Sequence, residues 1–155
     1  MLSDHVYARL SIFMPAAALR ALGRLNVPIY RLTRGRLMNK VGSAPVMLLT
    51  STGRRSGQSR TAPVVYGQDG ERLVAISSNG GNHNTPGWAY NLKANPDAEV
   101  EIRGRRRQVR ARVAEGEERA RLWEHMNLLY GGFDDYDANV SRDIAVFVLE
   151  PRPTG

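Results

Sequence analysis

From residue 48 to residue 66 the chain reads LLTSTGRRSGQSRTAPVVY. An apolar run from Pro45 to Leu49 enters a turn with two glycines, and a run rich in β-branched residues, Thr61 to Tyr66, leaves it. This pattern predicts two strands joined by a loop. Gly53 and Gly57 would allow the backbone to adopt positive φ and to approach a ligand closely.

The predicted loop carries the residue types that hold anions. Arg54, Arg55 and Arg60 are permanently charged planar forks that match phosphate or carboxylate. Backbone N–H groups in such a turn can also form an anion nest. We therefore expect a binding site for an acidic small molecule. The alternative that stays open is an ordinary polar hairpin whose arginines are solvated. The loop is not a Walker A loop, because no Gly-Lys-Ser/Thr ends it.

Composition narrows the class of protein. A chain of 155 residues with 42% apolar residues is long enough for one domain with its own core. The chain has no cysteine, which excludes disulfides, thiolate metal sites and cysteine nucleophiles. A net charge of +7 favours acidic cofactors, nucleic acid or anionic membrane surfaces without choosing between them. No apolar run reaches about 18 residues and no secretory signal begins the chain, so we expect neither a spanning helix nor export.

The first forty residues are predicted to be helical and basic. Apolar residues recur at helical spacing from Val6 to Leu22, Pro15 interrupts them, and a second basic segment runs from Pro28 to Lys40. Such a segment can lie on an anionic membrane surface, or it can pack on its own barrel or on a partner subunit. We divide the chain into a basic helical segment (1–41), a core domain (42–151) and a loose tail (152–155).

The remaining pattern predicts a mainly β fold with flanking helices. Thr85 is the expected N-cap of the first core helix, with Pro86 as its first residue, and a turn is expected at 68–70. Alternation predicts that Val109, Ala111 and Val113 face inward. The expected strands are Val46–Thr50, Thr61–Tyr66, Arg72–Ser78, Glu99–Arg103, Arg106–Ala114 and Ile144–Leu149, and the expected helices are Gly87–Ala94 and Glu115–Leu129. About six short strands with inserted helices favour a small antiparallel barrel.

No motif in the chain supplies chemistry of its own. The three histidines are scattered without metal-ligand spacing, and no Gly-x-Ser-x-Gly elbow is present. The chemistry would therefore belong to a cofactor. Trp88 is either a core anchor or a ring set against a flat cofactor. Tyr130, Phe133 and Tyr136 are either a local cluster or a lid over a planar substrate with a phenol as proton donor.

Several motifs, which follow one another along the chain, are typical of a known family. They are the segments 48–60, 77–81 (SSNGG), 86–92 (PGWAYNL), 94–96 (ANP) and 110–123 (RARVAEGEERARLW). The sequence, from about Asn26 to Pro151, resembles the deazaflavin-dependent nitroreductase and quinone reductase family, which uses coenzyme F-420. The resemblance implies a split β-barrel of the FMN-binding type.

The resemblance also implies a set of site residues. The loop at 53–60 would hold the phosphate and glutamate tail of the coenzyme. The implied cofactor-binding residues are Thr50, Arg54, Arg55, Ser56, Gly57, Arg60, Pro63, Ser77, Ser78, Asn79, Trp88 and Asn91, and the implied catalytic residues are Ser78, Tyr130 and Tyr136. The sequence departs from the family at Phe133, where a tyrosine is the suspected proton donor, and at Asn79, where a basic residue is common.

The implied activity is transfer of a hydride from the reduced 8-hydroxy-5-deazaflavin to a quinone-like or nitroaromatic acceptor. Two alternatives remain: FMN in place of the deazaflavin, or a binding and carrier protein without rapid turnover. A nucleic-acid-binding barrel is not expected, because the basic ribbon from Arg103 to Arg112 has no interleaved aromatic residue. We expect a cytoplasmic protein with a planar small-molecule partner and no metal. Oligomerisation and peripheral attachment at the inner face of the cell membrane stay open.

Overall fold

A computed structural model gives the structure of the chain and describes residues 25–37, 39–41, 44–77, 85–129 and 144–153. The strands are β1 (Lys40–Val41), β2 (Ala44–Thr52), β3 (Ser59–Asp69), β4 (Arg72–Ile76), β5 (Asp97–Ile102), β6 (Arg105–Val113) and β7 (Val146–Pro151). The helices with complete bounds are α3 (Gly87–Ala94) and α4 (Gly116–Leu129), and residues 25–32 are also helical.

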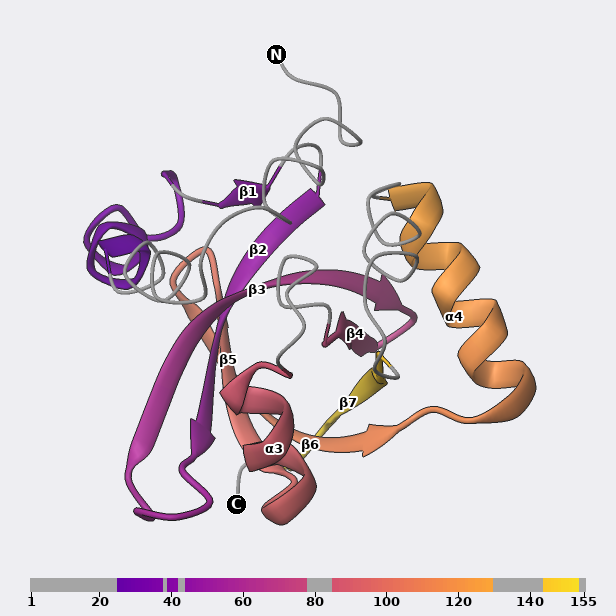
Figure 1. Cartoon of the computed structure of the whole chain (residues 1–155). Helices are drawn as coiled ribbons and strands as arrows, with labels where there is room; N and C mark the ends of the chain where they lie inside the picture. The colour runs from indigo at the N-terminus through magenta and orange to yellow at the C-terminus, as the bar shows by residue number, and fades with distance from the viewer. Residues whose placement is uncertain (1–24, 38, 42–43, 78–84, 130–143, 154–155) are drawn as a thin grey trace.

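Six of these strands close into a barrel (Figure 1). The strand order is β1-β2-β3-β4-β7-β6-β5, and β5 then pairs with β2 to complete the circle. Every pairing is antiparallel. The closing ladder matches Leu49 with Val100, some fifty positions apart in the chain. The expected antiparallel barrel of about six strands with flanking helices is therefore confirmed.

Alternate residues of all six barrel strands fill the interior. This buried cluster comprises Met47, Leu49, Val64, Leu73, Ala75, Ala98, Val100, Val109, Ala111, Phe147 and Leu149. Helix α3 adds Ala89 and Leu92 to the same cluster. The period of two in the strands puts one set of side chains inside, and the short helix covers part of that set.

Helix α4 packs on the outside of the barrel. Its buried Leu122 and Met126 meet Val74 and Val146 in a second apolar cluster. The helix lies so close to β3 that a Cβ atom at Gly67 would overlap the sulfur of Met126. The two clusters explain why β7 is buried on both faces, since its residues alternate between the interior and the surface beneath α4.

Several predicted boundaries are wrong, and strand pairing explains the differences. Strand β3 continues to Asp69, because Gly67 and Gln68 pair with the start of β4, and the turn lies at residues 70–71. Strand β4 ends at Ile76, two residues earlier than predicted. Short-range patterns do not reveal how far a partner strand extends a ladder.

Two predicted side-chain placements are also wrong. Pro86 rather than Thr85 is the N-cap of α3, and no side chain caps that helix. Val113, at the end of β6, is 37% exposed rather than buried in the interior, although it pairs with the buried Phe147. In contrast, the predicted bounds of α3 agree with the structure, and α4 begins one residue after its predicted start.

The predictions for residues 1–24, 78–84 and 130–143 fall outside the described residues. These include the N-terminal helical segment up to Arg24, the polar loop after β4 and the aromatic segment around Phe133. No helix among the described residues is long and apolar enough to cross a membrane.

Candidate functional site

The loop at residues 53–58 joins β2 to β3 and is held by its own backbone. The amide of Gly53 donates to the carbonyl of Gln58 at 2.7 Å, and the amide of Gly57 donates to the carbonyl of Gly53 at 2.8 Å. Gly57 has a φ of +71°, as expected, but Gly53 is not left-handed. A Cβ at Gly53 would lie 2.7 Å from the hydroxyl of Ser56 and 3.2 Å from the carbonyl of Gln58, so a side chain there would require the loop to shift.

The loop presents positive charge to solvent. Arg54, Arg55 and Arg60 are exposed, and none of them forms an ion pair with a described carboxylate. The guanidinium of Arg54 stacks on the ring of Tyr90, 4.1 Å from its centroid. Among the described residues no acceptor meets the amides of Arg55 and Ser56. This donor set fits a phosphate or carboxylate group of an acidic cofactor.

A buried amide attaches this loop to α3. The Asn91 side chain accepts a hydrogen bond from the amide of Arg54 at 3.0 Å and donates one to the hydroxyl of Ser51 at 3.1 Å. Both Asn91 and Ser51 are buried. The polar atoms of the Asn91 side chain are therefore used in hydrogen bonds within the protein. Its contribution to a site is to position the loop.

Sequence reasoning missed two residues of this arrangement, Ser51 and Tyr90. Ser51 is two positions beyond the inward-facing Leu49, so the period of two places it inside, where a hydroxyl needs a partner. Tyr90 lies on α3 beside Asn91, but nothing in its spacing indicates that an arginine from a distant loop stacks on it.

The other predicted cofactor residues lie on the barrel wall or at its edge. Thr50 pairs with Thr61 across β2 and β3, and their hydroxyls lie 2.8 Å apart. Pro63 is half-buried in β3 opposite Leu48. Ser77 is buried, and its hydroxyl accepts a hydrogen bond from the amide of Ala145.

Trp88 is an anchor of α3. Its ring meets Phe147 edge to face, with centroids 5.4 Å apart. This contact favours the packing role among the two predicted for Trp88, although the half-buried ring keeps part of its surface exposed. Ser78, Asn79, Tyr130 and Tyr136 lie outside the described residues.

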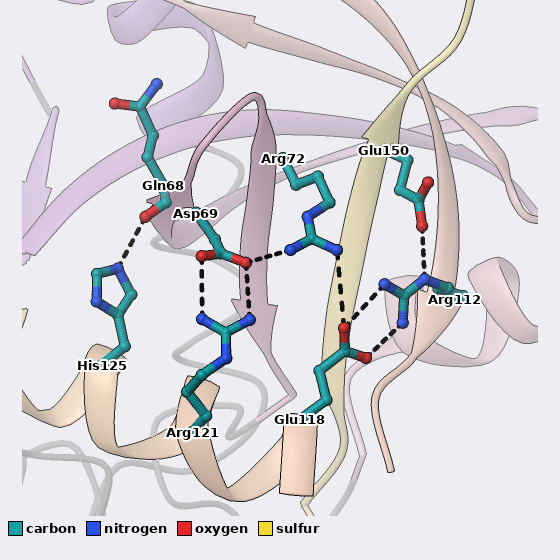
Figure 2. A network of polar contacts seen from close by, with 8 residues as sticks. All are labelled: Gln68, Asp69, Arg72, Arg112, Glu118, Arg121, His125 and Glu150. Atoms are coloured by element: carbon teal, nitrogen blue, oxygen red, sulfur yellow. Dashed lines mark hydrogen bonds and ion pairs between the residues drawn. The ribbon is translucent and has the colours of Figure 1, made fainter.

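A polar network fixes α4, the helix that leads to residue 130 (Figure 2). Asp69 accepts two hydrogen bonds from Arg121 at 3.1 Å and one from Arg72 at 2.7 Å. The Arg121 guanidinium, with Arg72 beside it, holds the pKa of the Asp69 carboxyl below its ordinary value. Glu118 of the same helix pairs with Arg112 of β6, which lowers the pKa of Glu118.

A closed antiparallel barrel with outer helices and a cationic loop at one end fits the split β-barrel class of folds. Comparison with known proteins narrows the class. Residues 22–151 match the F420H(2)-dependent quinone reductase family. The chain belongs to this family, which confirms the resemblance inferred from the sequence motifs.

Individual relatives agree with this assignment. An F420H(2)-dependent quinone reductase of Mycobacterium tuberculosis is 38% identical over 133 residues, which cover 83% of this chain and 89% of the relative. A solved structure of an F420-H2 dependent reductase has a TM-score of 0.63 at 33% identity, covering 68% of this chain and 94% of that one. Another, described as a domain-swapped dimer, has a TM-score of 0.65 at 30% identity and covers 82% and 95%.

Proposed function

We propose that this protein is an F420-dependent reductase that delivers a hydride to a quinone-like acceptor. The bound deazaflavin would supply the hydride chemistry, and the chain would supply binding, orientation and exclusion of water. The observation that carries the proposal is the 53–60 loop, in which three exposed arginines have no described carboxylate partner. The family and its relatives support the same cofactor.

In this proposal each described residue of the loop has a separate task. Arg55 and Arg60 bind the phosphate and carboxylate groups of the coenzyme tail with their guanidinium groups. The free amides of Arg55 and Ser56 add hydrogen bonds to the same anion, and Gly57 gives the turn that aims them. Arg54 is stacked on Tyr90, so its charge has a fixed place at the edge of the site.

The ring system of the coenzyme would lie against the barrel residues named by the family resemblance. Two borders would be formed by these residues. Thr50 and Ser77 would form the polar border, which Ser78 and Asn79 would continue, and Pro63 and Trp88 would form the apolar border. Ser78, Tyr130 and Tyr136 would act at the acceptor, as hydrogen-bond or proton donors. Asn91 differs from these residues, since its side chain acts through Arg54 and Ser51.

A binding titration tests the cofactor assignment. Fluorescence of oxidised F420, and separately of FMN, is followed as the purified protein is added. We expect F420 to bind more tightly than FMN, and Arg55→Ala and Arg60→Ala each to weaken F420 by about tenfold, since a charge-assisted hydrogen bond contributes about 1.5–3 kcal/mol. Lys93→Ala removes an exposed charge of α3 outside the loop and serves as the control. A preference for FMN, or equal losses in all three variants, would contradict the assignment.

The second candidate is a deazaflavin-binding carrier without rapid turnover. Phe133 favours it, because phenylalanine has no proton to give where the family has a suspected donor. A steady-state assay with F420H2 and menadione separates the candidates. Multiple turnovers support the reductase, whereas tight binding with no turnover supports the carrier. A nitroaromatic acceptor in the same assay tests the wider substrate range that the family resemblance implies.

We also propose peripheral membrane attachment through the N-terminal basic segment. Leu25, Leu32 and Leu37 are 62%, 88% and 58% exposed, and arginines lie between them. Apolar side chains beside basic ones suit an anionic lipid surface. Leu32→Ser/Leu37→Ser should reduce sedimentation with phosphatidylglycerol vesicles, and unchanged sedimentation would contradict this part of the proposal.

The oligomeric state is a separate proposal. Similarity to a domain-swapped dimer supports an oligomer of this chain. Light scattering of the purified protein across a range of concentrations tests it, and a monomer mass throughout would exclude a stable dimer.

A further inference from the structure

Two Arg-Gly turns meet at the end of the barrel opposite the 53–60 loop. One is Arg34-Gly35, after the helical residues 25–32, and the other is Arg103-Gly104, between β5 and β6. Because β5 runs antiparallel to β2, its turn lies beyond the end of β2 that is remote from Thr52 (Figure 1).

All four residues of these turns are left-handed. Their φ values are +52° and +74° for Arg34 and Gly35, and +51° and +79° for Arg103 and Gly104. Arg34 and Arg103 are the two residues other than glycine with positive φ in the described part of the chain. Such a backbone conformation is strained for arginine and persists only where the surroundings impose it.

At the positions of Arg34 and Arg103, the backbone conformation favours a residue other than arginine. The amide of Gly35 donates to the carbonyl of Tyr30 and the amide of Arg34 to that of Arg31, the pattern of a Schellman helix end. Glycine, or sometimes asparagine, normally occupies the place of Arg34 there. Ile102 pairs directly with Arg105, so Arg103 is the first residue of a two-residue hairpin turn in which asparagine or glycine is usual.

The surroundings hold both turns in place. The buried hydroxyl of Tyr30 accepts a hydrogen bond from the amide of Arg103 at 3.2 Å and donates to the carbonyl of Glu101 at 3.3 Å. A Cβ at Gly35 would lie 2.9 Å from the Cα of Arg103, and one at Gly104 would lie 3.4 Å from the Cβ of Arg34. Gly35 therefore admits the backbone of the other turn, whereas at Gly104 a side chain would only make ordinary contact with Arg34.

The packed turns border two adjoining hollows rich in arginine. Arg34, Gly35, Arg36, Asn39 and Arg103 line a hollow of about 510 Å³. Ile102, Arg103, Arg105, Arg106 and Arg107 line another of about 1060 Å³. Arg103 belongs to both.

These arginines carry positive charge that nearby acids do not balance. Arg106 pairs with Glu101 and Glu99. No carboxylate among the described residues forms an ion pair with the other five, which are Arg34, Arg36, Arg103, Arg105 and Arg107. The five guanidinium groups around these two hollows repel one another, and an anion between them would offset that repulsion.

We propose that these hollows form a second anion site, which binds a phosphate group between the guanidiniums of Arg34 and Arg103 and their neighbours. Arginine forks bind phosphate in a bidentate manner, and this function accounts for two arginines at positions where the turns favour asparagine or glycine. The site is separate from the 53–60 loop and does not depend on the reductase assignment.

The phosphate can come from a soluble compound or from a lipid headgroup. The exposed Leu32 and Leu37 flank Arg34 and Arg36 in a third hollow, which would suit a headgroup with acyl chains beside it. Both sources present the same chemistry to the arginines, and the experiment below has one arm for each.

In the first arm, pyrophosphate is titrated into the full-length, isotope-labelled protein at constant ionic strength, and backbone amide signals are followed by NMR. We expect residues 34–36 and 103–105 to respond separately from residues 54–57, which report the proposed coenzyme loop. In the second arm, vesicles of phosphatidylglycerol or of neutral phosphatidylcholine are sedimented with the protein.

The informative variant is Arg34→Asn/Arg103→Asn, because asparagine suits both left-handed positions and removes both guanidiniums. It should weaken the response at the turns by at least about tenfold, without lowering the thermal midpoint. Arg110→Gln/Lys93→Gln removes two exposed charges that lie outside the basic N-terminal segment and line neither hollow, and it should change the response less than about twofold.

A response to pyrophosphate identifies a soluble phosphate as a sufficient ligand, and binding to phosphatidylglycerol alone identifies the headgroup. The proposal is overturned if the turns respond to neither, if the two double variants lose binding equally, or if Arg34→Asn/Arg103→Asn unfolds at a clearly lower temperature. Equal losses would mean that net charge alone attracts the anion.

Discussion

At the scale of single residues, one buried amide determines where the cationic loop lies. Asn91 connects α3 to the amide of Arg54 and to Ser51, so it joins the loop, a helix and a barrel strand. The exposed arginines that would touch a ligand have no such support from ion pairs of their own. Correct placement of their guanidiniums therefore depends on a residue that the solvent hardly reaches.

Asn91→Ala should destabilise the protein and weaken F420 binding together. The change leaves the amide of Arg54 without its acceptor, which costs about 1–3 kcal/mol in unfolding free energy. Urea denaturation measures the stability and a fluorescence titration measures the affinity. The matched variant is Ser51→Ala, which keeps the acceptor for Arg54 and should lower stability while leaving F420 affinity near that of the parent. If Asn91→Ala binds F420 as well as the parent does, the positioning role is wrong.

At the scale of elements, α4 is attached to the barrel by an apolar face and by an ion-pair network. Leu122 and Met126 are fully buried against β4 and β7, whereas the side chains of Arg121 and Arg112 are 54% and 40% exposed. Burial of a leucine contributes more than an exposed ion pair does. The apolar face should therefore supply most of the attachment.

A pair of variants tests whether the apolar face stabilises the attachment of α4 more than the ion-pair network does. Leu122→Ala should lower the free energy of unfolding by about 3 kcal/mol, because it removes buried methyl groups and leaves a cavity. Asp69→Asn should lower it by about 1 kcal/mol, because the pairs with Arg72 and Arg121 are partly exposed. Chemical denaturation of both variants at neutral pH gives the comparison, and a larger loss in Asp69→Asn would show that the network dominates.

The Asp69 contribution should depend on pH. Its arginine partners lower the pKa of the folded carboxyl, so the stabilisation is complete above the unfolded pKa of about 3.9 and disappears as the pH falls through the lower folded value. The stability difference between the parent and Asp69→Asn should be constant from pH 7 to about pH 5 and shrink below about pH 4. A difference that grows on acidification would contradict this linkage.

Most of the elements could be predicted from the sequence, because their signals are local. The alternating and β-branched runs around residues 53–60 predict the β2–β3 hairpin, and the bounds of α3 follow from its flanking Pro86 and Asn95. The ends of β3 and β4 could not be predicted, because they depend on pairing between Gly67 and Val74. The cationic loop was predictable from composition, whereas the roles of Asn91 and Tyr90 follow from contacts across about forty residues.

At the scale of the whole molecule, the distribution of charge separates structural arginines from those available to ligands. Arg106, Arg110 and Arg112 of β6 pair with carboxylates of neighbouring strands and of α4. The described arginines of the 53–60 loop and of the two Arg-Gly turns have no such partners. Among the described residues, arginines without an ion-pair partner thus gather at opposite ends of a closed barrel, where their field can attract an acidic ligand.

The salt dependence of F420 binding follows from this distribution. Between about 50 and about 500 mM salt the Debye length falls from about 14 Å to about 4 Å, so attraction between the exposed loop and an anionic tail is largely screened. The affinity of the parent should fall by about tenfold over this range. Arg55→Ala/Arg60→Ala should bind more weakly at low salt and lose much less on addition of salt, so that the two binding curves converge at high salt.

Arg34→Asn/Arg103→Asn is the control for this measurement, because it removes the same formal charge from the opposite end of the barrel. If proximity governs the attraction, its salt dependence should match that of the parent, since the removed charges lie farther from the loop than the Debye length over most of the range. If both double variants flatten the salt dependence equally, the total charge of the molecule governs binding. The 53–60 loop would then not be the specific binding site of the coenzyme tail.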